Sequence, residues 1–167
     1  AMPGGLFPAY VDLHTAKPIV DEAAIFTIGS RGDSFYEYTC KQALSRANLA
    51  QRRMYAAACE AALNSVKQHL IVDFPCGATT TFSNEGCAFV ASATYDGAQR
   101  SFQAVHEMEH LACFIIGPLL QFRASSSEGG DDAASMMREN HALAQRIGHT
   151  CVAMYDATPT GLAAEKV

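Results

Sequence analysis

Apolar residues recur at helical spacing in four stretches of the chain, so the pattern predicts four helices. The predicted helices run from Asp33 to about Ala47, from about Leu49 to Leu70, over about 111–122, and from Asp131 to about Ala157. Asp33-Ser34 and Asp131-Asp132 supply side chains that favour the start of a helix. Helices therefore account for most of the regular structure that we expect.

The apolar positions also predict which face of each helix is buried. In the first helix, Phe35, Tyr38 and Gln42 lie near one face. In the second helix a stripe recurs at every fourth residue and is formed by Met54, Ala58, Ala62, Val66 and Leu70. The buried face expected for the last helix consists of Ala133, Met137, Asn140, Ala144, Ile147, Cys151 and Met154.

The connections between the helices carry weaker β signals. Two short apolar stretches, 6–11 and 24–28, are separated by a polar stretch and predict a loose β-hairpin. Residues 88–95 read as one strand that ends at Asp96-Gly97, and a loop is expected over 75–81. Ser125–Gly130 reads as a flexible link. We expect a mainly α fold in which αα-hairpins are joined by loops or short β-hairpins, as in barrels of paired helices.

Composition and charge restrict the partners of the chain. Twelve Lys and Arg residues face seventeen Asp and Glu residues, a formal net charge of −5. This balance predicts no nucleic-acid interface and no contact of this segment with a membrane surface. The longest apolar run, Leu111 to Leu120, is about half of the roughly 20 residues that a membrane-spanning helix needs. Ala1 to Gly5 lack the pattern of a secretory signal.

The six cysteines form no C-x-x-C pair, which disfavours a zinc ribbon or a thioredoxin-like motif. From their spacing alone they are either buried thiols or one or two disulfides. Cys151 falls on the apolar face of the last helix, where a small buried residue is the simplest interpretation.

The stretch from Ile28 to Tyr38 combines an Arg, two carboxylates and three aromatic rings at a loop-to-helix junction. Its simplest explanation is a capping box, in which Ser34 and Glu37 exchange hydrogen bonds with the first-turn backbone. The crowding at a helix mouth instead favours a functional site, and aromatic rings beside carboxylates suit sugar binding.

A second stretch, His106-Glu107-Met108-Glu109-His110, satisfies H-E-x-x-H, the helical motif in which two His bind zinc and the Glu activates water. The remaining candidate ligands, Glu128 and Glu139, flank the predicted link or lie on a polar helix face. A zinc metallohydrolase using His106, Glu107 and His110 requires both histidines on one face of a continuous helix. Otherwise His106 is a solvated loop histidine.

Taken in order, these stretches resemble glycoside hydrolase family 47, the class I α-1,2-mannosidases. The run G-x-x-x-D-S-[FY]-Y-E-Y-x-x-K matches Gly29–Lys41, and M-[DE]-H-L-x-C-F matches Met108–Phe114. Further along the chain, T-C-x-x-[ML]-Y matches Thr150–Tyr155, and [PS]-T-G-L-x-[PA]-E matches Pro159–Glu165. Residues 5–8 and the helix around Met54-Tyr55 are also similar, so the resemblance spans nearly the whole chain.

The resemblance implies a fold and an activity. The family fold is a barrel of seven αα-hairpins, an (α/α)7 barrel, and residues 1–167 would be part of that catalytic domain. The activity is removal of terminal α-1,2-linked mannose from N-glycans with inversion, in the lumen of the endoplasmic reticulum or the Golgi. The implied partners are oligomannose N-glycans on glycoproteins, and an N-terminal anchor elsewhere in a longer protein is compatible with the family.

The resemblance also assigns roles to individual residues. Asp33 is the implied catalytic carboxylate, and Glu37 and His110 are implied to hold the sugar or its water network. Arg31 stands at the position linked to the choice of glycan branch, and an Arg there is more similar to the endoplasmic-reticulum subgroup. Cys113 and Cys151 match the family's disulfide, which closes a loop of about 38 residues and would stabilise the fold by roughly 3–4 kcal/mol.

Other parts of the family site have no match in this sequence. The general acid is expected before Ala1, and the second base and the Thr that binds Ca²⁺ are expected after Val167, so no metal ligand is expected within the chain. The chain alone is therefore expected to be inactive. A glycan-binding protein without activity and an inert truncated product remain alternatives.

Two stretches depart from the family pattern. Residues 118–122 replace a small apolar run that ends in Leu-Gly, and Ala164 replaces a Pro. Neither departure falls on a residue that is assigned to chemistry, so both concern local packing.

Overall fold

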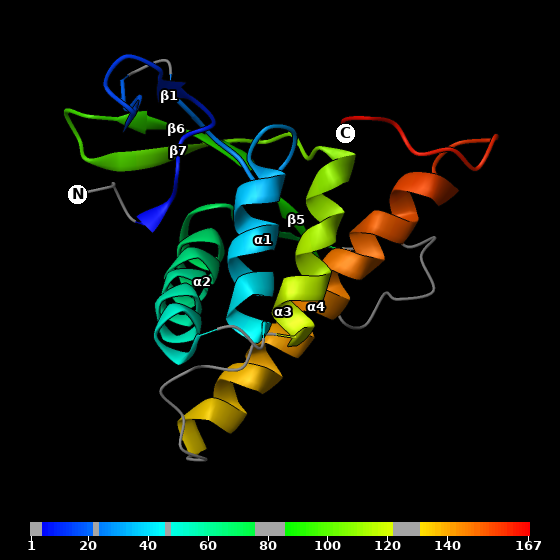
Figure 1. The fold of residues 1–167 in the computed structure, drawn as a ribbon. Helices are drawn as coiled ribbons and strands as arrows, with labels where there is room; N and C mark the ends of the chain where they lie inside the picture. The colour runs from blue at the N-terminus through cyan, green and yellow to red at the C-terminus, as the bar shows by residue number, and fades with distance from the viewer. Residues whose placement is uncertain (1–4, 22–23, 46–47, 76–85, 122–130) are drawn as a thin grey trace.

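The computed structural model describes residues 5–21, 24–45, 48–75, 86–121 and 131–167. The described part is mainly helical and carries small antiparallel sheets, which agrees with the expected class of fold. Most strands gather at one end of the helices, and the C-terminus lies at this end too (Figure 1). This end also carries the residues that the sequence assigns to chemistry.

The predicted helices are confirmed, with ends close to those expected. The helical elements are α1 (Asp33–Leu44), α2 (Leu49–His69), the 3₁₀ helix η2 (His110–Ile115), α3 (Ile116–Gln121) and α4 (Asp131–Asp156). The third predicted helix is thus a 3₁₀ turn that continues directly into a short α-helix. The side chain of Asn48 accepts a hydrogen bond from the amide of Ala50 and caps the start of α2.

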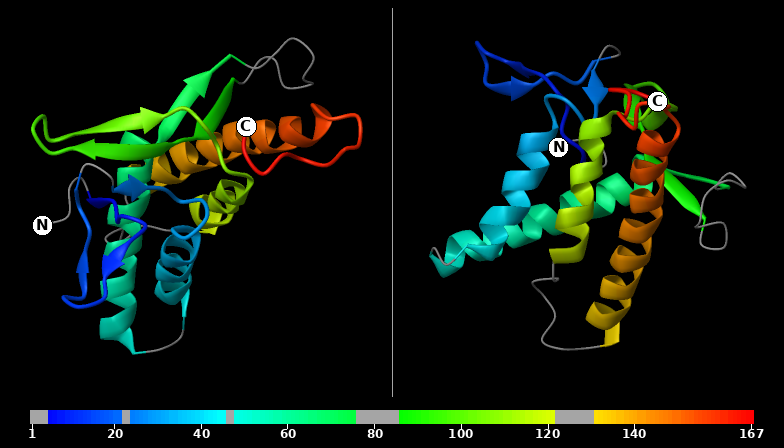
Figure 2. Two further views of the ribbon diagram at one scale, coloured as in Figure 1. Left: turned by 90° about the horizontal axis from the view of Figure 1, so that it is seen from above. Right: turned by 90° about the vertical axis from the view of Figure 1, so that its right-hand side faces the viewer.

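The helices α1 and α2 run in opposite directions and form an αα-hairpin (Figure 1). The disulfide between Cys40 and Cys59 joins them. In the side view of Figure 2, α1, the η2–α3 segment and α4 stand side by side in that order, and contacts link each neighbouring pair. The segment η2–α3 therefore lies between α1 and α4.

The buried face of two helices was predicted only in part. In α2, Ala62 and Val66 are buried as expected, but Met54 and Ala58 are exposed. Residues at a constant spacing of four drift around a helix by about 40° per step, so a long four-residue stripe cannot stay on one face. The buried positions instead alternate between steps of three and four, and in α2 they are Ala56, Cys59, Ala62, Leu63, Ser65 and Val66.

The face predicted for α1 is wrong. Phe35 and Tyr38 are exposed, whereas Tyr36 and Cys40 face the core. In α4 the predicted face is buried at Asn140, Ala144, Ile147, Cys151 and Met154, but Met137 is exposed.

Seven short strands form three antiparallel sheets in the described residues. The strands are β1 (Val11–Asp12), β2 (Lys17–Pro18), β3 (Ile25–Phe26), β4 (Ile71–Phe74), β5 (Cys87–Val90), β6 (Ser92–Asp96) and β7 (Ser101–Val105). The sheet orders are β1-β2, β3-β6-β7 and β4-β5.

The hairpin expected from the first 28 residues is therefore smaller than predicted. Strands β1 and β2 form a hairpin within the polar stretch, whereas β3 pairs with β6. Only an isolated bridge between Pro8 and Phe26 joins the two apolar stretches that were expected to pair.

The single strand predicted over residues 88–95 is two strands in different sheets, with the break at Ala91. Strand β5 pairs with β4 and packs against α4, and β6 pairs with β3 and β7. A continuous apolar run does not reveal such a change of partner. Of the predicted loop over 75–81, all but Pro75 lies outside the described residues, as does the Ser125–Gly130 link.

The core lies between the helices and the strand layer. Tyr36 is 1% exposed, and its hydroxyl oxygen accepts a hydrogen bond from the amide of Phe7 at 3.1 Å. Burial raises the pKa of the Tyr36 phenol to about 12. This contact fixes the N-terminal segment 6–8 against α1.

All cysteines within the described residues are in disulfides, so the alternative of buried thiols is wrong. The pair Cys113–Cys151 is confirmed. Cys87 is disulfide-bonded in addition to the pairs Cys40–Cys59 and Cys113–Cys151. The predicted number of disulfides, one or two, is therefore too low. No helix in the described ranges is both long and apolar enough to cross a membrane.

Gly32, directly before α1, tolerates no side chain. A Cβ atom there would lie 2.0 Å from the backbone oxygen of Thr27, whereas a Cβ on Gly97 meets nothing within 4 Å. We expect Gly32→Ala to destabilise the protein by about 3 kcal/mol and Gly97→Ala to change its stability by less than about 0.5 kcal/mol. Urea unfolding of both variants measures the difference, and equal stabilities would contradict the close approach.

Candidate functional site

Asp33 is the first residue of α1, and its side chain is half-buried. Gly32 is the N-cap residue, and no side chain caps the helix, so the predicted capping box of Ser34 and Glu37 does not form. Within the described part of the chain, the Asp33 carboxylate makes no hydrogen bond or ion pair. The interpretation of this acid as a mere helix cap is therefore wrong.

Glu109 joins the loop before α1 to the segment that carries His110. One of its carboxylate oxygens accepts a hydrogen bond from the amide of Ser30 at 2.6 Å, across 79 residues of sequence. Its side chain is only 14% exposed, and a Cβ on Gly29 would lie 2.6 Å from the same oxygen. Gly29 is thus required for this close contact.

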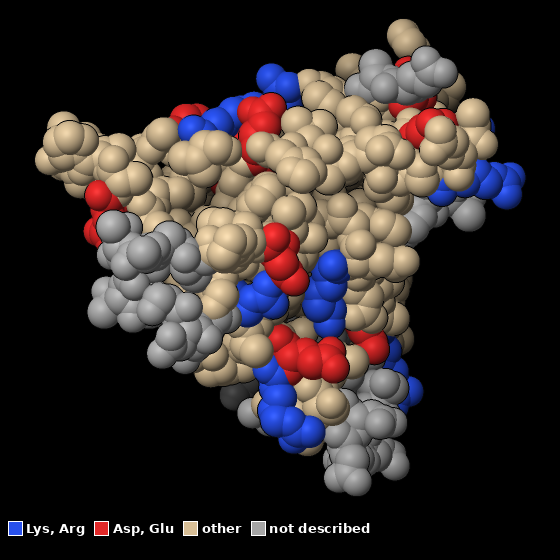
Figure 3. Space-filling view, turned by 180° about the vertical axis from the view of Figure 1, so that it is seen from behind, with Lys and Arg blue, Asp and Glu red and all other residues tan. Residues whose placement is uncertain are grey.

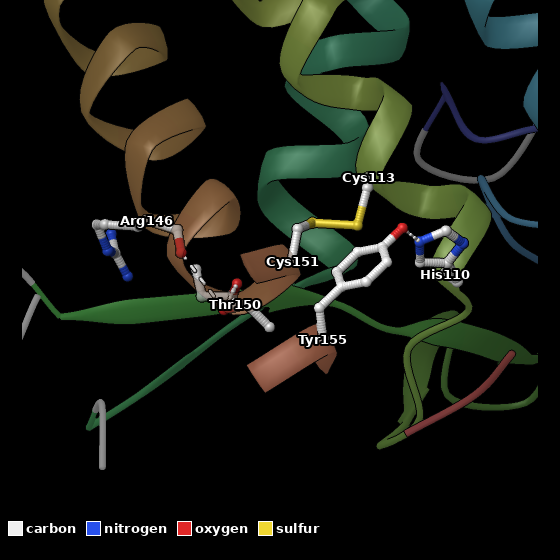
Figure 4. Close-up of a disulfide and its surroundings, with 7 residues drawn as sticks. His110, Cys113, Arg146, Thr150, Cys151 and Tyr155 are labelled. Carbon is white, nitrogen blue, oxygen red and sulfur yellow. Dashed lines mark hydrogen bonds between the residues drawn. A yellow bond between two sulfur atoms is a disulfide. The ribbon is translucent and has the colours of Figure 1, made fainter. Parts of the chain in front are cut away.

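His110 begins η2, just as Asp33 begins the neighbouring α1. A ring nitrogen of His110, Nε2, lies 2.5 Å from the hydroxyl oxygen of Tyr155 on α4. One turn further along η2, Cys113 is bonded to Cys151 of α4, as Figure 4 shows. The disulfide and the His110–Tyr155 contact together fix η2 against α4.

Residues 165–167 form backbone hydrogen bonds with Met108 and His110. The amide of His110 donates to the carbonyl oxygen of Glu165 at 2.8 Å, and Met108 and Val167 exchange two hydrogen bonds. Lys166 also lies 3.9 Å from a carboxylate oxygen of Glu109. All four motifs that the sequence singled out therefore meet at one end of the molecule.

Arg31 has a backbone φ of 76°, a conformation that is uncommon for a residue with a side chain. Its exposed guanidinium donates a hydrogen bond to the hydroxyl of Tyr10, and the guanidinium carbon lies 5.5 Å from the centroid of the Tyr10 ring. Arg31 also lines a polar cavity of about 280 Å³ together with Ser30, Glu109 and Glu165.

Glu37 lies one helical turn after Asp33 and is paired with Lys41 on the same helix. Its hydrogen bond raises the pKa of Lys41 above the ordinary value. Glu37 also lines a mostly apolar cavity of about 220 Å³ between α1 and the η2–α3 segment, opposite Phe114.

The structure brings Asp33, Arg31, Glu37 and His110 to adjoining elements, but their surroundings differ. The cavity beside Glu37 and the cavity beside Arg31 are separate, and neither is lined by Asp33 or His110. The roles implied for Asp33 and His110 require one sugar-sized cavity that both residues line, and this shared cavity remains a prediction.

Sequence reasoning did not find Glu109, Glu165 and Tyr10. Glu109 and Glu165 each stand within a motif, but a motif does not show that its acidic residues share a cavity with an arginine 78 or more positions away. Tyr10 lies outside the motifs that were assigned to chemistry. The local signal available for Glu109 was its place directly before His110 in the matched run Met108–Phe114.

The zinc hypothesis is wrong for this structure. His106 follows strand β7 and His110 begins η2, with extended backbone at Glu109 between them, so the two histidines do not share a helix. Glu139 is exposed on α4, and Glu128 lies outside the described residues. Within the described ranges no group of three or more His, Cys, Asp or Glu side chains could hold a metal ion.

The same finding bears on calcium, which prefers six to eight oxygen ligands. The described carboxylates at this end are dispersed or engaged, as Glu109 is with Ser30 and Lys166. These residues do not by themselves fit a calcium site, so the roles assigned to them below do not involve the ion.

Comparison with known proteins identifies the family of the chain. The model of glycosyl hydrolase family 47 matches residues 1–167. The chain is 33% identical over 174 residues to a mannosyl-oligosaccharide 1,2-alpha-mannosidase of Candida albicans, covering 98% of this chain and 27% of that protein. The chain therefore belongs to glycosyl hydrolase family 47.

Two further relatives are named as endoplasmic reticulum mannosyl-oligosaccharide 1,2-alpha-mannosidases. The Saccharomyces cerevisiae protein is 30% identical, with 98% of this chain and 28% of that protein covered. The human protein is 29% identical, and the match covers 98% of this chain and 20% of that protein. The chain thus spans about a quarter of the length of the curated relatives that it matches.

Glu109 and its near neighbour Glu107 provide a matched test of the link between the motifs. We expect Glu109→Ala to lower the free energy of unfolding by about 1–2 kcal/mol, because the hydrogen bond from Ser30 to a charged acceptor is lost. Glu107 forms an ion pair with Lys166 at 3.6 Å, and both side chains are about half exposed. Such an exposed pair contributes little, so Glu107→Ala should lower the free energy of unfolding by less than about 0.5 kcal/mol.

Urea unfolding measures both variants. Equal losses for the two would show that Glu109 does not support the loop before α1.

Proposed function

We propose that this chain is part of the catalytic domain of an inverting α-1,2-mannosidase that removes terminal mannose from oligomannose N-glycans. The observation that carries the proposal is the meeting of four separate family motifs at the starts of the packed helices α1 and η2, which carry Asp33 and His110. Within the described residues the Asp33 carboxylate has no hydrogen-bond or ion-pair partner, which leaves it available for chemistry.

Inversion requires two carboxyl groups about 6.5–9.5 Å apart, so that one water fits between the base and the anomeric carbon. Asp33 is proposed as a carboxylate that takes the proton of that water while the water attacks. The acid that protonates the leaving oxygen is assigned to another part of the protein. Residues 1–167 alone are therefore proposed to be inactive.

The remaining candidates are proposed to bind the sugar. His110, held by Tyr155, can donate to or accept from a hydroxyl, and Glu37 and Arg31 offer an acceptor and a donor on either side of Asp33. Calcium, if it is bound as in the family, is assigned to residues beyond this chain and would supply coordination of sugar hydroxyls.

The same proposal covers the fold and the compartment. The αα-hairpin of α1 and α2 would be one unit of an (α/α)7 barrel that the rest of the protein completes. Several relatives are named as endoplasmic reticulum enzymes, and disulfides persist in an oxidising lumen. We therefore propose the secretory pathway, with the endoplasmic reticulum favoured over the Golgi.

Release of mannose from an oligomannose N-glycan by the complete protein tests the activity. We expect release by the unaltered protein and its loss when a calcium chelator is added. Asp33→Asn should lower kcat by about 10²- to 10⁴-fold, because the amide cannot accept the proton. Asp73→Asn is the control, since Asp73 is an exposed residue of β4 that is paired with Arg146.

Absence of mannose release from the complete protein would show that it is not a mannosidase. Retained binding of the oligosaccharide in that case would instead support a glycan-binding protein. Equal activity of Asp33→Asn and the unaltered enzyme would remove Asp33 from the mechanism.

A further inference from the structure

Tyr10 contacts Arg31 through its hydroxyl. The Tyr10 hydroxyl oxygen accepts a hydrogen bond from Nη1 of Arg31, and the guanidinium carbon lies 5.5 Å from the centroid of the Tyr10 ring. These two contacts together place the guanidinium at the hydroxyl end of the ring rather than over its face. Because the guanidinium is exposed, it would otherwise be free to move.

The backbone on both sides of Tyr10 is fixed. The amide of Ala9 donates to the carbonyl oxygen of Ile25 at 2.8 Å, and the carbonyl oxygen of Tyr10 accepts from the amide of Ile19 at 3.0 Å. The next residue, Val11, pairs with Pro18 in the β1-β2 hairpin. The backbone of Tyr10 is thus fixed on both sides, and the loop that carries Arg31 is hydrogen-bonded to Glu109.

Arg31 lies where two different cavities adjoin. The polar cavity of about 280 Å³ is lined by Tyr10, Ser30, Arg31, Glu109, Glu165 and Lys166, among others. A second cavity, of about 350 Å³, is mostly apolar and is lined by Phe7, Pro8, Val11, Arg31 and Phe35, among others. Arg31 and Ala9 belong to both linings, so the position of the guanidinium decides how the two spaces are divided.

The two cavities suit different parts of an oligosaccharide. Carboxylates and a guanidinium bind hydroxyl groups, whereas the tilted rings of Phe7 and Phe35, with centroids 4.3 Å apart, offer apolar surface for the C–H side of a pyranose. The polar cavity also holds Glu109 and Glu165, which would attract a freed guanidinium. A phenol that holds Arg31 therefore keeps this cation available for a ligand.

We propose that Tyr10 is a positioning residue that holds Arg31 between the two cavities and thereby determines which oligomannose branch the site accepts. This inference rests on the proposed mannosidase function. Tyr10 acts through Arg31 and contributes no step of the reaction.

The variant Tyr10→Phe in the complete protein removes the hydroxyl and keeps the ring. With an oligomannose N-glycan as substrate, we expect KM to rise about fivefold, kcat to stay within twofold, and the proportions of the first product isomers to change. Tyr55→Phe is the matched control, because Tyr55 lies on α2 and lines neither of the two cavities beside Arg31.

A double-mutant cycle separates positioning from a general structural effect. In an Arg31→Leu background, Tyr10→Phe should leave kcat/KM and the isomer proportions unchanged, because the group it holds is absent. An undiminished effect of Tyr10→Phe in that background, or no effect in the unaltered background, would overturn the proposal.

Labelling of arginines with phenylglyoxal, followed by peptide mass spectrometry, gives a readout that does not depend on activity. Tyr10→Phe should speed modification of Arg31 at least threefold, while the exposed Arg52 and Arg53 on α2 react at unchanged rates. An unchanged rate at Arg31 would show that Tyr10 does not hold it. If the unaltered protein releases no mannose, the proposed function fails, and the labelling still decides whether Tyr10 positions Arg31.

Discussion

The arrangement of the whole site depends on the fixation of one segment, residues 108–115, from three directions. Its carboxylate at Glu109 supports the loop before α1, its backbone pairs with residues 165–167, and Cys113 is bonded to α4. A 3₁₀ helix is geometrically poorer than an α-helix and is seldom long. Here the external bonds supply the stability that the six residues of η2 lack, and they set where His110 lies.

These bonds have a common property: each joins residues that are far apart in the sequence. Forming them requires that α1, η2 and α4 already lie side by side, because loop closure costs entropy before any contact is gained. The disulfide between Cys113 and Cys151 lowers this cost by restricting the unfolded chain, by roughly 4 kcal/mol for a loop of 38 residues. The Cys40–Cys59 bond does the same for the α1–α2 hairpin, by roughly 3 kcal/mol for 19 residues.

Local patterns predicted the elements well but not their surroundings. Helix starts at Asp33 and Leu49, and a last helix ending within one residue of Ala157, follow from periodicity and capping, which are properties of neighbouring residues. The buried face of α1 was wrong because Tyr36 and Cys40, not Tyr38, meet the N-terminal segment and α2. That partner choice is tertiary, and no local rule contains it. The division of residues 88–95 between two sheets was missed for the same reason.

The candidate site, too, could be predicted from the sequence only in part. The pairing of Cys113 with Cys151 was predictable only through the resemblance to a family, since six cysteines alone allow fifteen connectivities. Glu109, Glu165 and Tyr10 became visible only when the cavity beside Arg31 was known. A side chain that supports a loop 79 residues away leaves no periodic signal.

On the face drawn in Figure 3, basic and acidic side chains are interspersed rather than gathered by sign. Charge on this face therefore gives no single-sign field that would draw a strongly charged ligand. The proposed recognition of a neutral sugar relies instead on hydrogen bonds and ring contacts, and the cavities on either side of Arg31 offer both.

The surroundings of Asp33 explain how a half-buried acid can stay available. The amide of Gly29 donates to the Thr27 hydroxyl, and the amides of Gly32 and Asp33 both donate to the carbonyl oxygen of Gly29. With the Ser30 amide bonded to Glu109, the turn before α1 is satisfied without help from the Asp33 side chain. The positive end of the helix dipole favours a carboxylate in the first turn. The acid is therefore stabilised where it lies, and within the described residues none of its hydrogen-bonding capacity is used.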